Sequence, residues 1–177
     1  MNSEDYDDII DDENIWMQDE IPDSDTFSKE NINLCIMDEV VVNKLNKEQE
    51  KRLNKLFTYV SSHKRCTVIL CGHDYSQIPP PVRRSVDVFI VWKLHDYESQ
   101  KQLCKKFGLK NSSLYTFFKN YAKSKYDFLM VDMLDNSPAK FRLNGYYPLN
   151  PEIFEGNDEI DDEIDKREYR KQKNLHN

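Results

Sequence analysis

The sequence predicts an α/β fold built on a mostly parallel sheet that is flanked by helices. Short apolar runs recur along the chain and are bounded by polar residues, a pattern typical of strands in a buried sheet. The first two runs are separated by a segment whose apolar residues have helical spacing, which gives the strand-helix-strand order of a parallel pair. The 177 residues are enough for one domain of this kind and too few for a second of full size.

The distribution of charge divides the chain into three segments. Residues 1–30 contain 12 acidic residues and one lysine, and residues 155–177 contain 8 acidic and 5 basic residues, so that 19 basic and 12 acidic residues remain in between. We therefore expect a disordered or loosely docked acidic arm at 1–30, an α/β domain at 31–154 and a charged tail at 155–177. A domain with a net charge of +7 suits a surface that meets phosphate groups, although ends that are merely solvated would give the same distribution.

The first half of the domain contains three expected strands and one helix. The first strand, residues 32–37, is apolar at nearly every position and is expected to be buried on both faces. Asn46 and Gln49 have the spacing of a capping pair, and the helix that follows is expected to end near residues 61–62. Its apolar face comprises Leu53, Leu56, Phe57 and Val60. Residues 67–71 and 87–92 give two further buried strands, joined by a loop that is broken by three prolines at 79–81.

The second half of the domain is expected to contain two short helices and two strands. One helix includes Leu103 and Phe107 and ends at Gly108, and the other spans residues 114–121. Residues 128–131 form an apolar strand, and residues 139–143 alternate as an edge strand does before the Asn-Gly turn that follows.

The four cysteines are expected to be ordinary buried thiols. Cys66 and Cys71 lie near His63 and His73 in the sequence, but a strand between the two cysteines would hold their sulfurs about 16 Å apart, too far for one metal ion. No apolar run approaches the ~20 residues of a bilayer span, and the first residues are acidic where a secretory signal would be basic and then apolar. These observations favour an intracellular protein that does not contact a membrane.

Three groups of residues are candidates for chemistry. Asp38 and Glu39 directly follow the first strand, where an acidic pair can hold Mg²⁺ and polarise a water, although apolar strands end in acidic residues by chance as well. His73 follows the second strand and would reach the same point if the two strands are neighbours; a surface histidine without a role is the alternative. Arg83, with Arg84, follows the prolines and is either a phosphate ligand or half of a solvated basic pair.

The order and spacing of these elements resemble the C-terminal half of the genome-packaging ATPases of the FtsK–HerA superfamily, in particular the poxvirus-type and Maverick/Polinton-type members. The resemblance covers about residues 31–147. It rests on an apolar strand ending in Asp-Glu, an amphipathic helix, a strand followed by Gly-His-Asp-Tyr and Ile-Pro, an arginine before the next strand, and two closing strands, at residues 36–39, 67–79, 82–85, 88–93, 126–132 and 141–144.

The resemblance implies a partial P-loop NTPase fold of the RecA/FtsK type and a role for each candidate residue. Asp38 corresponds to the Walker B ligand of Mg²⁺, Glu39 to the catalytic glutamate, and Arg83 to the arginine after Ile-Pro. His73 occupies the sensor position, where the family usually has glutamine. Mg²⁺ and ATP are the implied cofactors. None of the four glycines is followed by Lys-Ser or Lys-Thr, so the G-x-x-x-x-G-K-[ST] loop that binds the phosphates is absent from this chain.

These observations lead to two expectations of function. The first is the C-terminal portion of a DNA-packaging ATPase of a virus or virus-derived element, which acts on double-stranded DNA and is inactive alone because it lacks the phosphate loop. It would assemble as a homo-oligomeric ring or with a partner chain that supplies the Walker A half. It would work in the host cytoplasm or nucleus, at sites of virion assembly. The second is a degenerate, non-enzymatic module that binds nucleic acid or a partner ATPase subunit.

Overall fold

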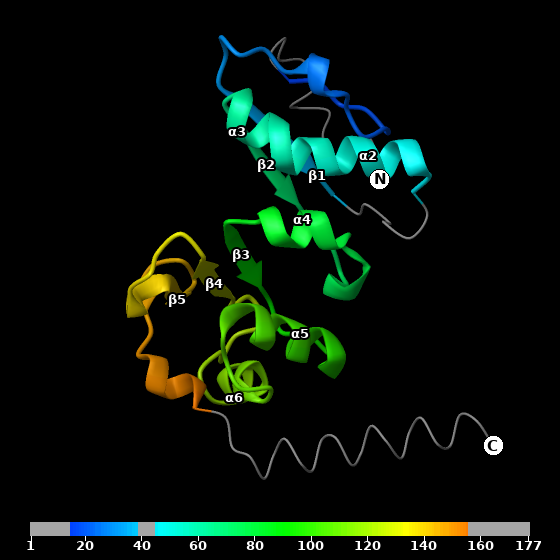
Figure 1. The fold of residues 1–177 in the computed structure, drawn as a ribbon. Coiled ribbons are helices and arrows are strands. Elements are labelled where there is room, and N and C mark those ends of the chain that lie inside the picture. Colours follow the sequence, from blue (N-terminus) through cyan, green and yellow to red (C-terminus); the bar gives the residue numbers. More distant parts are fainter. Residues whose placement is uncertain (1–14, 39–44, 156–177) are drawn as a thin grey trace, which may run out of the picture. The chain divides into compact units, whose positions relative to one another are not determined.

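The structure is a computed structural model, and it describes residues 15–38 and 45–155. These residues form an α/β fold with a two-stranded parallel sheet and a four-stranded antiparallel sheet, both flanked by helices (Figure 1). The chain divides into two compact units: the first comprises residues 1–72 and 79–82, and the second comprises residues 73–78 and 83–177. No helix among the described residues is long and apolar enough to cross a membrane.

The first unit contains a parallel pair of strands joined by a helical crossover. Strands β1 (Asn33–Met37) and β2 (Cys66–Leu70) pair in parallel, with Asn33 opposite Cys66 and Met37 opposite Leu70. Between them lie α2 (Lys47–Lys55), a π-helical turn η4 (Leu56–Val60) and the short α3 (Ser61–His63), which form one continuous helical segment. Both strands and the helix were predicted from the apolar pattern, and all three are confirmed.

The two faces of the β1–β2 sheet differ in exposure. Cys35 and Met37 are buried on the face against which the helical segment packs. Leu34 and Ile36 on the opposite face are 60% and 62% exposed, and Ile69 of β2 is exposed beside them. The prediction of burial on both faces is therefore wrong for these strands, because the described helices cover one face of the sheet.

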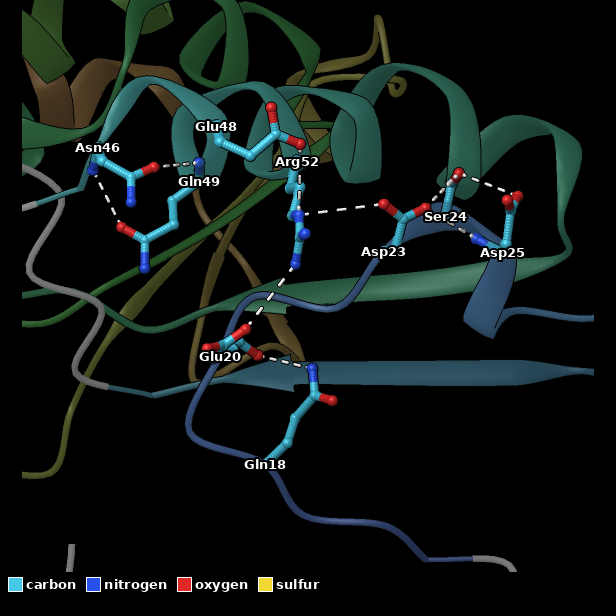
Figure 2. Close-up of polar contacts among 9 residues, drawn as sticks. All are labelled: Gln18, Glu20, Asp23, Ser24, Asp25, Asn46, Glu48, Gln49 and Arg52. Carbon is cyan, nitrogen blue, oxygen red and sulfur yellow. Dashed lines mark hydrogen bonds and ion pairs between the residues drawn. The ribbon is translucent and has the colours of Figure 1, made fainter.

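Figure 2 shows how α2 begins and how the preceding chain is attached to it. The Asn46 side chain accepts from the Gln49 N–H, and the Gln49 side chain accepts from the Asn46 N–H, both at 2.9 Å, so the predicted capping pair forms a complete capping box. Arg52, one turn further on, forms ion pairs with Glu20, Asp23 and Glu48 at 3.6–3.9 Å.

Part of the acidic N-terminal segment is packed in the first unit. Ile21 and Phe27 are buried, and a single 3₁₀ turn, η2 (Ser24–Thr26), lies between them with Asp23 as its N-cap. The pKa of Asp23 is lowered, first by the hydrogen bond from the Asp25 N–H and then by the Ser24 hydroxyl. The predicted arm at 1–30 includes residues 1–14, which lie outside the described residues, as do residues 156–177 of the predicted tail.

The second unit is built on an antiparallel sheet in the order β3-β4-β5-β6. Its strands are β3 (Val88–Val91), β4 (Leu129–Asp132), β5 (Phe141–Leu143) and β6 (Tyr147–Pro148). Helices α5 (Tyr97–Phe107) and α6 (Ser113–Asn120) connect β3 to β4. The prediction of a mostly parallel sheet is therefore wrong. A single crossover helix returns the chain in parallel, whereas a connection with two helices and short turns between later strands gives antiparallel neighbours.

The remaining short elements of the described residues are α4 (Pro80–Ser85) and the 3₁₀ turns η5 (Tyr75–Gln77), η6 (Pro138–Lys140) and η7 (Pro151–Phe154). Helix α4 occupies the segment that was predicted to be a proline-broken loop. Proline is tolerated in the first turn of a helix, where its missing N–H would have no helical partner. Arg83 and Arg84 therefore lie in the last turn of a helix and not in an extended loop.

The core of the second unit lies between the sheet and helices α5 and α6. It includes Leu103, Leu114, Phe117, Leu129 and Val131, all of which are buried. The helical segments predicted around 103–107 and 114–121 provide this core, as their spacing indicated.

The β5–β6 connection consists of residues 144–146, between the paired Leu143 and Tyr147, and it contains a tight turn at Asn144 and Gly145. Asn144 and Gly145 both have positive φ angles, 53° and 78°, and the N–H of Tyr146 donates to the carbonyl of Leu143. Positive φ at both positions is the geometry that an Asn-Gly turn of this type requires, so the predicted turn is confirmed. The chain after the turn pairs with β5 as β6, so β5 is an inner strand and the prediction that it is an edge strand is wrong.

Candidate functional site

The carboxyl ends of β1 and β2 meet, as the predicted site requires. The ladder extends one residue past the strands, where the N–H of Cys71 donates to the carbonyl of Met37 at 2.8 Å. Asp38 follows Met37 directly and is exposed. Burial raises the pKa of the Cys71 thiol, and the Asp38 carboxylate contributes to that rise. Glu39, the second member of the predicted acidic pair, lies outside the described residues.

The other two predicted residues, His73 and Arg83, belong to the second unit, whereas Asp38 belongs to the first. His73 is exposed and follows Gly72 at the end of the β2 ladder. The predicted approach of His73 to the point that Asp38 and Glu39 would occupy stays a prediction, as does the role of Arg83 as a phosphate ligand.

Arg83 is held by two contacts within the second unit. Its Nη1 donates to Oε1 of Gln102 on α5 at 3.0 Å, and its guanidinium carbon lies 5.1 Å from the centre of the Tyr75 ring. Arg83 is half-buried, whereas Arg84 is exposed. Burial raises the pKa of Tyr75, and the nearby Arg83 charge partly opposes that rise. The two arginines are therefore unlike one another, and Arg83 is a positioned side chain and not half of a solvated pair.

Asp74 organises the chain between β2 and α4 and was not singled out from the sequence. Its Oδ1 accepts from the N–H and hydroxyl of Ser76 at 2.8 and 2.7 Å and from the hydroxyl of Ser99 at 3.0 Å. Its Oδ2 accepts from the Gln77 amide at 3.0 Å. Ser99 is 1% exposed on α5, so this network attaches the loop to that helix. The Asp-x-Ser order of residues 74–76 is the sequence signal for such a cap, but the partner on α5 has no local signal.

A shallow hollow lies beside these residues on α5. Gln102, which accepts from Arg83, is on its wall. The hollow is lined by Glu98, Lys101, Gln102, Lys105, Leu109 and Asn111. The charged residues of this lining are two lysines and one glutamate.

The cysteines confirm the prediction of buried thiols in three cases out of four. Cys35, Cys66 and Cys104 are buried, and Cys71 is exposed. Burial, followed by the neighbouring Cys66, raises the pKa of Cys35 to about 11, which keeps the thiol protonated and unreactive. His63, which the sequence places near Cys66, stacks on the ring of Tyr59 at 4.8 Å between centroids.

Among the described residues, the end of β1 has a side chain that suits Mg²⁺ but no element that binds the phosphates of ATP. An exposed carboxylate such as Asp38 suits Mg²⁺, which keeps several waters and takes one or two protein carboxylates together with the phosphates of its nucleotide. Among residues 15–38 and 45–155, no three His, Cys, Asp or Glu side chains are placed to hold a metal ion together. Asp38 would therefore serve the metal side of such a site, whereas the sequence lacks the glycine-lysine loop for the phosphate side.

Comparison with known proteins adds no relative. No protein-family model, no curated protein and no solved structure matches this chain.

Proposed function

We propose that this chain is the C-terminal portion of a DNA-packaging or DNA-translocating ATPase of a virus or virus-derived element. The observation that carries the proposal is the parallel pairing of β1 and β2, with Asp38 beside Cys71 where the two strands end. Ligands of open α/β sheets bind at the carboxyl ends of such strands. The motifs that follow along the chain, up to the arginine after Ile-Pro, resemble those of the packaging ATPases in order and spacing. This resemblance is what specifies the proposed activity.

The proposed roles divide between the two units. In the first, Asp38 would hold Mg²⁺ and Glu39 would polarise the attacking water. In the second, His73 would act as the sensor of the bound phosphate, and Arg83 would stabilise the charge that develops on it. The contacts of Arg83 with Gln102 and Tyr75 support its role, because a charged group that is already oriented needs little reorganisation when the transition state forms.

The chain would act on double-stranded DNA either as a homo-oligomeric ring or together with a partner chain. Only a different partner chain would supply the phosphate-binding half, because every copy of this chain lacks the loop. The exposed face of the β1–β2 sheet supports this part of the proposal. Parallel sheets are normally covered on both faces, whereas Leu34 and Ile36 are open here. A partner that carries the missing loop and its helix would cover them.

The test is Mg²⁺-dependent ATP hydrolysis, with and without duplex DNA. It is made on the purified chain and on a longer chain that includes any in-frame G-x-x-x-x-G-K-[ST] segment encoded upstream of Met1. The purified chain alone should show no turnover. The longer chain should hydrolyse ATP, and Glu39→Gln should lower its rate by roughly 100-fold or more, since a general base contributes at least that much.

The matched control is Glu30→Gln, an exposed glutamate before β1, which should leave turnover unchanged. Turnover that Glu39→Gln does not reduce would refute the assigned role of this residue. Absence of turnover and of nucleotide binding in both chains would refute the ATPase proposal as a whole.

The second candidate is a non-enzymatic module that binds nucleic acid or a partner ATPase subunit. The absence of the phosphate loop from the sequence favours it. Duplex binding by both chains without any hydrolysis would be its expected result in the same experiment.

A further inference from the structure

The outer face of the antiparallel sheet in the second unit carries an exposed row of apolar side chains. Val88 and Ile90 of β3 and Trp92 just after it are exposed, whereas Val91 points into the core and is buried. Helices α5 and α6 contribute to the core on the opposite side of the sheet. The outer row is therefore open, and it ends at a tryptophan that is 52% exposed.

A second aromatic ring stands beside Trp92 on this face. The register of β3 and β4 pairs Ile90 with Met130, and its continuation brings Trp92 next to Phe128. The centroids of the two rings are 5.4 Å apart. The backbone at Gly145 passes beside Phe128 and Met130, since a β-carbon placed there would lie 4.0 Å from the Phe128 ring and 3.6 Å from Met130 Sδ. The β5–β6 turn thus borders Phe128, and the Trp92 ring stays accessible.

Positive charge gathers at the end of the face that carries the two rings. Lys93 follows Trp92 directly, and Lys123 and Lys125 precede Phe128; all three are exposed. Asp127 lies among them and keeps its negative charge, because hydrogen bonds from the Asn144 side chain and from the N–H groups of Lys123 and Ser124 lower its pKa, the Asn144 bond first. The three lysines and Asp127 together therefore carry a net charge of +2.

The other end of the face has the opposite charge. Asp132 lies opposite Val88 in the β3–β4 register, and Asp87 precedes Val88. The lysines are therefore concentrated beside the aromatic rings and are not distributed evenly along the sheet.

We propose that Trp92 and Phe128, with Lys93, Lys123 and Lys125, form a stacking platform for single-stranded nucleic acid. Bases would stack on the accessible Trp92 ring, and the phosphates on either side would meet the three lysines. Aromatic rings on an open sheet face beside cationic side chains are the combination that binds single strands without sequence preference. This inference goes beyond the proposed function, which concerns duplex DNA, and it does not depend on ATP hydrolysis.

The experiment measures the binding of a fluorescently labelled oligothymidylate to the full chain by anisotropy. Trp92→Ala should weaken binding between about 5-fold and about 150-fold, because one stacked base contributes that much to affinity. Trp92→Phe should retain most of the affinity, since a phenyl ring still stacks. Trp16→Ala is the matched control: Trp16 is the other tryptophan of the chain, is 62% exposed and lies in the first unit, and its removal should change nothing.

The lysines are tested through the dependence of binding on salt. Lys125→Ala should reduce the slope of log affinity against log salt by about 0.7, the value for one phosphate contact with a single strand. Lys119→Ala on α6 is the control and should leave the slope unchanged. Circular dichroism and thermal melting of each variant would show that the fold is retained.

Four results would overturn the proposal. Equal affinity of the Trp92→Ala and Trp16→Ala variants would mean that no base stacks on Trp92, and absence of binding by the wild type would mean that the platform has no such ligand. Equally tight binding of a duplex of the same length would indicate contact with the backbone only. Self-association in sedimentation experiments that Trp92→Ala abolishes would show that a second copy of the chain covers this face.

Discussion

Asp74 is the residue through which the loop after β2 is attached to the second unit. It accepts from two groups of Ser76, from the Gln77 amide and from the buried hydroxyl of Ser99. These bonds favour its charged form, so its pKa lies below the ordinary value, with the Ser76 hydroxyl as the largest cause. Arg83, in the following helix, is held by Gln102 of the same α5 helix. The contacts of the predicted arginine with Gln102 and Tyr75 therefore include none of the other predicted residues.

Replacing Asp74 should destabilise the second unit in a manner that depends on pH. Asp74→Ala should lower the free energy of unfolding by about 1–2 kcal/mol at pH 7, the usual effect of losing a cap and its hydrogen bonds. A carboxyl whose pKa is lower in the folded chain stabilises the fold above the pKa of the unfolded chain and loses that effect as the pH falls through the folded pKa. The difference from wild type should therefore shrink below about pH 4.

Urea unfolding between pH 7 and pH 3 measures this difference. Asp87→Ala is the control, since Asp87 is an exposed aspartate of the same unit. This substitution should change the free energy of unfolding at pH 7 only slightly. The prediction would be contradicted if the loss of unfolding free energy caused by Asp74→Ala stayed constant down to pH 3.

At the level of elements, the capping box of α2 is a local device that the sequence predicts completely. Asn46 and Gln49 are three residues apart, and each side chain has its partner on the backbone of the other. A capping box can be predicted from the sequence because both of its partners lie within one turn of the helix. The same holds for Asn144 and Gly145, whose turn needs two residues that tolerate positive φ.

The arrangement of the strands was less predictable from the sequence than their positions. An apolar run indicates a strand but not its neighbour, so β3 could be placed and its antiparallel pairing with β4, some forty residues away in the chain, could not. The burial of Leu34 and Ile36 was overestimated for a related reason, because the number of faces covered depends on other elements. Likewise, Gln102 and Ser99 meet Arg83 and Asp74 only through the packing of α5.

Removing the N-cap of α2 should lower the stability of the first unit. Asn46→Ala should reduce the free energy of unfolding of the first unit by about 1 kcal/mol, because it leaves the Gln49 N–H without its side-chain partner. Asn46→Ser should restore most of the loss. Urea unfolding monitored by circular dichroism measures both, with Asn136→Ala, an exposed asparagine, as the control. Equal stability of the Asn46→Ala variant and the wild type would show that the box contributes nothing.

On the scale of the whole molecule, the chain consists of two units with separate sheets. Each has fully buried residues of its own, such as Leu53 in the first and Phe117 in the second. Helix α4 spans the boundary between the units, which lies between Val82 and Arg83. Because each unit has a core of its own, we expect a core mutation to expose the amides of its own unit first.

Leu53→Ala should therefore open the first unit and leave the second protected. A buried Leu→Ala change costs about 2–5 kcal/mol, enough to expose the amides of β1, α2 and β2 to exchange. Hydrogen exchange followed by mass spectrometry should show faster exchange in these elements and unchanged exchange in β4 and α6. Phe117→Ala is the reciprocal variant and should have the opposite pattern. Faster exchange throughout the chain in either variant would mean that the chain unfolds as one cooperative body.

The Asn-Gly turn between β5 and β6 also bears on the chemical ageing of the protein. An asparagine followed by glycine is prone to deamidation, since the unhindered glycine nitrogen can attack the side-chain amide and close a succinimide ring. In the folded hairpin, Oδ1 of Asn144 accepts from the Phe128 N–H at 3.0 Å and its Nδ2 donates to Asp127 at 2.9 Å. These bonds hold the amide in place, so deamidation should occur mainly in molecules whose hairpin has opened. The amount of isoaspartate at position 144 in a stored sample would therefore measure how often the hairpin opens.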